Sequence, residues 1–218
     1  MYDGTVAMYD IQAKNETPSM ESAANAGKHS DPVWQVKWLD RGADRDEVLI
    51  SISSDGRVTQ WSIAKGLEYA DVMKLKRVAR RAPSGPRSKN AAARSANQVP
   101  FISRLTSGMS FDFSPADTRI YIAGTEDGWI HKCSTSYSEQ YLESYQGHMG
   151  PVYRAEWSPF RQGLFISCSA DWTTKLWTEG RESALLTFTT SNDEVNDVRW
   201  CPTNSTVFGC ATSGGRIE

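Results

Sequence analysis

Nine residues, Ser53-Ser54-Asp55-Gly56-Arg57-Val58-Thr59-Gln60-Trp61, carry a pattern that returns twice more in the chain. It returns in residues 125–133 and in residues 169–177. Each copy has a Ser or Thr, then an Asp two residues later, and a Trp or Cys six residues after that Asp. Asp-Gly pairs between short apolar runs are typical of two-residue β-hairpins, because Gly accepts a positive φ. The repeat therefore predicts a series of similar hairpins.

Further landmarks accompany these turns at fixed distances. Phe113, Trp157 and Trp200 precede the turn positions 127, 171 and 214 by the same interval, and Trp38 precedes Asp55 by three residues more. A His precedes both Trp38 and Trp157 by nine residues. The turns fall at positions 3, 55, 127, 171 and 214, so the last two spacings are 44 and 43. Those spacings match the roughly 40–45 residues of a four-stranded propeller blade, and the longer ones indicate insertions.

These spacings predict an all-β fold, a β-propeller that fills only an arc. We expect residues 1–218 to form three nearly complete blades, centred on 29–61, 101–133 and 147–177, with partial strands on both sides. The turns at Asp3 and Gly214 lie close to the two ends of the sequence, so the blades that contain them are incomplete. We therefore expect the sequence to be a fragment of a longer protein. Residues 12–28, which are small and polar, are predicted to be an inter-blade loop.

Residues 74–100 form a basic, low-complexity insertion that contains no acidic residue. Its cations are Lys74, Lys76, Arg77, Arg80, Arg81, Arg87, Lys89 and Arg94. Pro, Gly and a run of Ala make it unable to build a core, so we interpret it as a solvated loop. The alternative is an electrostatic contact with an acidic surface, such as tubulin. A nucleic-acid contact is less favoured because no aromatic residue is interleaved through the basic core.

The rest of the composition indicates no catalytic chemistry. The net charge is −2, the N-terminus lacks the features of a signal peptide, and no apolar run is long enough to span a bilayer. No phosphate-binding, zinc-protease or serine-hydrolase motif is present, and the four Cys are not spaced as metal ligands. We expect no enzyme activity, no cofactor, no metal, and neither a nucleic-acid nor a membrane partner. The third histidine, His131, is expected to be a surface or cross-strand residue.

The repeated motif resembles that of the WD-repeat family. In that family a His before the first strand, a Ser or Thr on the second, an Asp in the turn and a Trp on the third form a hydrogen-bonded tetrad. By this resemblance the tetrad residues are His29, Ser53, Asp55 and Trp61 in one blade, Thr125 and Asp127 in the next, and His148, Ser169, Asp171 and Trp177 in a third. These side chains are therefore expected to be structural, since a buried Asp needs donors and a buried indole needs an acceptor.

A more specific resemblance covers about residues 29–210. The segments 31–38, 53–61, 124–138 and 165–177 look, in that order, like axonemal dynein intermediate chains, with the inner-arm type nearest and the outer-arm type next. The resemblance implies a non-catalytic scaffold in the axoneme of a cilium or flagellum, docked on the tail of a dynein heavy chain beside other intermediate and light chains. A generic WD-repeat scaffold unrelated to dynein is the alternative. Large aromatic residues near the blade tops are candidate partner contacts: Trp34, Trp129, Tyr153 and Trp172.

Overall fold

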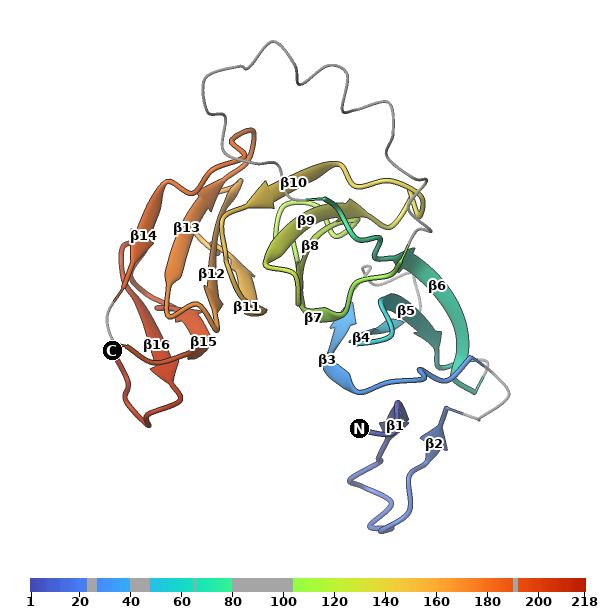
Figure 1. Cartoon of the computed structure of the whole chain (residues 1–218). Coiled ribbons are helices and arrows are strands. Elements are labelled where there is room, and N and C mark those ends of the chain that lie inside the picture. The colour runs from blue at the N-terminus through green and yellow to red at the C-terminus, as the bar shows by residue number, and fades with distance from the viewer. Residues whose placement is uncertain (23–26, 40–47, 65, 80–103, 190–191) are drawn as a thin grey trace, which may run out of the picture.

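The computed structural model describes residues 1–22, 27–39, 48–64, 66–79, 104–189 and 192–218 (Figure 1). Within these ranges every regular element is a β-strand, and all strand pairs are antiparallel. No helix in the described ranges could therefore cross a membrane.

Three sheets have four strands each, joined as simple meanders. The first blade contains β3 (Val33–Leu39), β4 (Val48–Ser53), β5 (Arg57–Ser62) and β6 (Glu68–Lys74). The second blade contains β7 (Gly108–Phe113), β8 (Ile120–Thr125), β9 (Trp129–Ser134) and β10 (Glu143–Gln146). The third blade contains β11 (Val152–Trp157), β12 (Leu164–Ser169), β13 (Thr174–Thr178) and β14 (Leu186–Phe188).

A two-stranded sheet lies on each side of the three blades. β1 (Ala7–Met8) pairs with β2 (Met20–Glu21), and β15 (Val195–Trp200) pairs with β16 (Phe208–Thr212). In Figure 1 the five sheets follow one another in chain order along an open arc, with β3, β7, β11 and β15 on its inner side. The prediction of an incomplete propeller with three full blades is therefore confirmed.

The hydrophobic core lies mainly between neighbouring blades. One cluster joins the first blade to the second, for example Ile52 to Phe111, and another joins Ile122 of the second blade to Trp157 of the third. A third cluster joins Ile166 to the β15–β16 sheet. Each blade is thus stabilised by the faces of its neighbours, as in other repeat proteins.

The predicted loop 12–28 contains a strand. β2 lies inside it, with Met20 opposite Met8 in β1, and the Ser22 hydroxyl accepts a hydrogen bond of 3.1 Å from the amide of Val6. The small polar composition of this segment conceals these two anchors, so the segment predicted as an inter-blade loop includes one short strand that the sequence did not indicate. Residues 23–26, and most of the basic insertion (80–100), lie outside the described residues.

Candidate functional site

Two of the blades contain a linked network of His, Asp, Ser and Trp. In the first blade His29 Nδ1 lies 2.9 Å from Asp55 Oδ2. His29 Nε2 lies 2.7 Å from Ser51 Oγ, which also accepts a hydrogen bond of 2.8 Å from Trp61 Nε1. Since the carboxylate can only accept, Nδ1 of His29 donates to it, and in the neutral imidazole Nε2 then accepts the Ser51 hydroxyl proton.

The third blade repeats this network. His148 Nδ1 lies 3.0 Å from Asp171 Oδ2, and His148 Nε2 lies 2.7 Å from Ser167 Oγ. Trp177 Nε1 donates to the same hydroxyl at 2.8 Å. Both His side chains are fully buried, so these networks fasten the turn to the centre of each blade.

The serines of these networks are not those predicted. Ser53 instead donates to the carbonyl of Asp31 at 2.9 Å and accepts the Asp55 amide at 3.2 Å. Ser169 likewise donates to the carbonyl of Gly150. Alternate residues of a strand face the same side, so both serines of each strand point toward the network. In each strand the serine farther from the turn, Ser51 or Ser167, accepts the hydrogen bond from the indole of Trp61 or Trp177.

The buried charges are held in one protonation state by these bonds. Burial raises the pKa of the Asp55 carboxyl, but hydrogen bonds from His29 and the Arg57 amide outweigh burial and hold this pKa well below its usual range. The Asp171 carboxyl has a lowered pKa for the same balance of burial and hydrogen bonds, here from His148 and Thr173. Burial lowers the pKa of His148, which Asp171 opposes only in part. Structural hydrogen-bonded networks of this kind shift pKa values as well as catalytic sites do.

The described residues of the second blade form a different arrangement around the turn. Ala123 and Cys133 occupy the positions of the network serine and tryptophan, four residues before and six after Asp127. The Asp127 carboxylate instead accepts bonds of 2.8 and 2.9 Å from the Arg77 guanidinium and one of 2.7 Å from the Thr106 hydroxyl. The predicted Thr125 donates to the Trp129 carbonyl at 3.0 Å.

His131 is buried, so the prediction of a surface position was wrong and that of a cross-strand role describes it better. Its Nδ1 lies 2.8 Å from the hydroxyl of Ser144, its partner in β10. Its ring stacks on Tyr141 with centroids 3.8 Å apart, and more distantly on Trp129. Burial lowers the pKa of His131 to about 3, so the ring is neutral.

The four candidate contact aromatics differ in exposure. Trp34 and Trp172 are each 46% exposed, Tyr153 is partly buried with its hydroxyl 3.2 Å from Glu194, and Trp129 is 5% exposed. Trp129 therefore packs inside the molecule, against His131, and offers no exposed anchor. Trp172 has a positive φ of 68°, where Gly56 and Gly128 stand in the other two blades. A Trp in this conformation is strained, and such strain is concentrated at functional positions.

The described cations of the basic insertion are paired with carboxylates of this chain. Lys74 lies 3.6 Å from Asp71, Lys76 lies 3.2 Å from Glu139, and Arg77 binds Asp127. The other predicted cations, Arg80, Arg81, Arg87, Lys89 and Arg94, lie outside the described residues.

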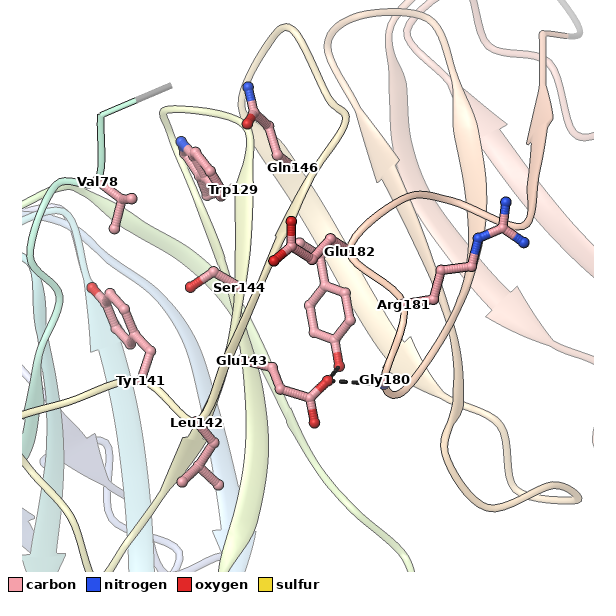
Figure 2. Close-up of a pocket in the computed structure, with 11 residues that line it drawn as sticks. Val78, Trp129, Tyr141, Leu142, Glu143, Ser144, Gln146, Gly180, Arg181 and Glu182 are labelled. Carbon is pink, nitrogen blue, oxygen red and sulfur yellow. Dashed lines mark hydrogen bonds between the residues drawn. The ribbon is translucent and has the colours of Figure 1, made fainter. Parts of the chain in front are cut away.

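A cavity of about 450 Å³ lies between the second and third blades, along β10 (Figure 2). Glu143 fastens its two walls together, because its Oε2 accepts bonds from the Tyr145 hydroxyl at 2.8 Å and from the Gly180 amide at 3.0 Å (Figure 2). No cluster of metal-ligating side chains occurs among the residues that the structure describes. We interpret the cavity as a crevice between blades.

Comparisons of the sequence with known proteins agree with this fold. Residues 139–178, which include Ser167, Asp171 and Trp177, match the family model described as WD domain, G-beta repeat. The chain is 46% identical to dynein axonemal intermediate chain 4 of Xenopus laevis, over all of this chain and 29% of that protein. It is 36% identical to dynein intermediate chain 2, ciliary, of Heliocidaris crassispina, over 99% of this chain and 29% of that protein.

The chain has the WD-repeat propeller fold and is similar, along its whole length, to axonemal dynein intermediate chains. Dynein axonemal intermediate chain 1 of Bos taurus is also similar, with 38% identity over 81% of this chain and 24% of that protein. The chain thus spans less than a third of the length of these relatives. In this chain the networks of His29 and His148 lie inside the first and third blades, where they link the turn to the strands.

Proposed function

We propose that this propeller segment is a non-catalytic scaffold of an axonemal dynein complex and that it docks on the dynein heavy chain through its turn face. The turn face is the surface at the Asp-centred turns, next to His29 and His148. The relatives that carry the name axonemal dynein intermediate chain support the assignment to dynein. The proposed location is the axoneme of a cilium or flagellum, with other intermediate and light chains as further partners. A tubulin contact by the basic insertion stays a prediction.

One observation carries the choice of surface. Trp172 and Met149 are 46% and 75% exposed, and both adjoin Asp171, which accepts the Met149 amide at 2.9 Å. A strained, exposed Trp beside an exposed Met is typical of an interface anchor, because both side chains can bury a large apolar area against a partner and few polar atoms lose water in doing so.

Replacement of Trp172 by Gly tests this proposal. Gly accepts the positive φ without strain, so the variant should be at least as stable as the wild type. Its recovery of heavy chain, after affinity purification of the full-length protein from cilia, should fall by about tenfold. A matched control is Phe160→Ala, since Phe160 is 44% exposed in the β11–β12 loop at the other end of the blade.

The control should leave the recovery unchanged. Equal recovery with Trp172→Gly and with wild type would reject the turn face as the docking surface. Absence of any dynein chain beside the wild-type protein would instead favour a generic WD-repeat scaffold.

A further inference from the structure

The third blade lies between two neighbours, the second blade and the β15–β16 sheet, yet large apolar side chains are exposed at its turns. Met149 is 75% and Trp172 is 46% exposed. The turn of the second blade lies against the Met149 loop, since a Cβ atom at Gly128 would lie 2.4 Å from the carbonyl oxygen of His148. Met149 and Trp172 therefore form an apolar surface that continues to the turn of the second blade.

Carboxylates lie on two sides of this apolar surface. Glu126 is exposed in the turn of the second blade. Glu194 is exposed directly before β15, where its Oε2 accepts a hydrogen bond of 3.2 Å from the Tyr153 hydroxyl. We call Met149, Trp172, Glu126 and Glu194 the turn-face patch. An apolar centre between acidic side chains complements a partner surface that is apolar at its centre and basic at its rim.

Two cations of the same region have other partners. Arg77, at the turn of the second blade, is paired with Asp127 at 2.8 Å. Lys175, three residues after Trp172, donates from its ammonium group to the Thr187 hydroxyl at 3.1 Å. Neither cation therefore neutralises the two glutamates of the patch.

Main-chain amides around the patch are used within the chain. The amides of Met149 and Thr173 donate to the Asp171 carboxylate at 2.9 and 3.1 Å. The amide of Glu126 donates to the carbonyl of Ser107 at 2.9 Å. An extended peptide binds largely through main-chain hydrogen bonds to a sheet edge, and these amides are not available for such bonds. An α-helix satisfies its own main chain and presents only side chains, so it suits this surface better.

We infer that the turn-face patch binds an amphipathic α-helix of the partner, with a basic residue on each flank of its apolar side. The apolar side of the helix covers Met149 and Trp172, and its Lys or Arg side chains pair with Glu126 and Glu194. This inference rests on the proposed docking at the turn face and adds the chemistry of the bound segment.

Photo-crosslinking in the full-length protein identifies the bound segment. With p-benzoylphenylalanine in place of Met149, the protein should cross-link to its partner in complexes from cilia, and mass spectrometry locates the site. The cross-linked segment should have apolar residues at the i, i+3, i+4 and i+7 spacing of a helix face, flanked by Lys or Arg. The matched control is the same amino acid in place of Phe160, which is 44% exposed at the other end of the blade. It should not cross-link to that segment.

Charge reversal measures the proposed ion pairs. A synthetic peptide with the cross-linked sequence should bind the full-length protein, and the double substitution Glu126→Lys and Glu194→Lys should raise its Kd by about tenfold at low salt. The effect should shrink at higher salt, because ions screen exposed charges. Glu16→Lys is the matched control, since Glu16 is exposed in the β1–β2 loop, and it should leave the Kd unchanged.

The outcomes distinguish this inference from the docking proposal. An acidic segment, a segment without a helical apolar face, no cross-link from position 149, or a Kd unchanged by charge reversal would overturn the inference. A segment of the expected chemistry in a protein other than a dynein chain would support the inference and reject heavy-chain docking. A cross-link to the heavy chain through an acidic segment would do the reverse.

Discussion

The second and third blades solve the same structural problem with different chemistry. In the third blade a buried chain of His148, Ser167 and Trp177 ties the Asp171 turn to the centre of the sheet. In the second blade Asp127 is held from outside by the half-exposed Arg77, and the centre is filled by apolar side chains. The turn and the strand register are alike in both, so the hydrogen-bonded network is one way to build this blade and not a requirement.

The difference predicts where the molecule is sensitive to substitution. A buried network fails as a unit when one member leaves, because the remaining donors and acceptors lose their partners. An exposed ion pair contributes little, because water replaces it. Matched substitutions at equivalent positions of the two blades therefore measure what the network adds.

The largest difference is expected at the position six residues after the turn Asp. Trp177 is fully buried and contacts the rings of Tyr145, His148 and Phe165. Trp177→Ala should lower the free energy of unfolding by about 3–5 kcal/mol, because it leaves a large cavity. Cys133→Ala at the equivalent position should cost about 1 kcal/mol, since it removes a single sulfur atom. Urea denaturation followed by far-UV circular dichroism measures both, and equal losses would contradict the comparison.

The turn aspartates should differ by a smaller amount. Asp171→Ala leaves the buried Nδ1–H of His148 without its acceptor, so we expect a loss of about 3 kcal/mol. Asp127→Ala removes the partner of Arg77, which is 54% exposed, and the acceptor of the buried Thr106 hydroxyl, so it should cost about 1–2 kcal/mol. The same urea experiment checks this pair. If Asp127→Ala costs as much as Asp171→Ala, the bonds of Asp127 to Arg77 and Thr106 stabilise the fold as much as the network does.

The architecture could be predicted well because each propeller blade repeats the same residue types at the same intervals in the sequence. The turn Asp, the aromatic residue at a fixed interval before it and the regular spacing of the later turns are all local, so strands β7–β13 could be placed from them. The short strand β2 was missed, because two residues between polar neighbours carry no periodic signal.

The details of the site were less accessible from the sequence. Ser51-Ile52-Ser53 and Ser167-Cys168-Ser169 offer two serines on one face of each strand, and only the three-dimensional position of the indole selects between them. The role of Arg77 was missed because its partner Asp127 is 50 residues away. One feature of the sequence did indicate that the second blade lacks the His of the network. Arg104 stands nine residues before Phe113, at the position where the other two blades have His.

The smallest expected effect concerns pH. Burial lowers the pKa of His131 to about 3, whereas an unfolded histidine titrates near 6.5, so the unfolded chain binds one more proton between these values. This group therefore destabilises the fold as the pH falls below about 6.5, by about 1.4 kcal/mol for each pH unit once the unfolded histidine is protonated. His131→Phe keeps a ring to stack on Tyr141 and should reduce the fall in unfolding free energy between pH 7 and pH 5.

The control is His148→Phe, which should reduce this fall less, because Asp171 partly opposes the lowering of the His148 pKa by burial. Urea denaturation at pH 7, 6 and 5 compares the slopes, and a slope unchanged by His131→Phe would show that His131 is not the group whose protonation opposes folding.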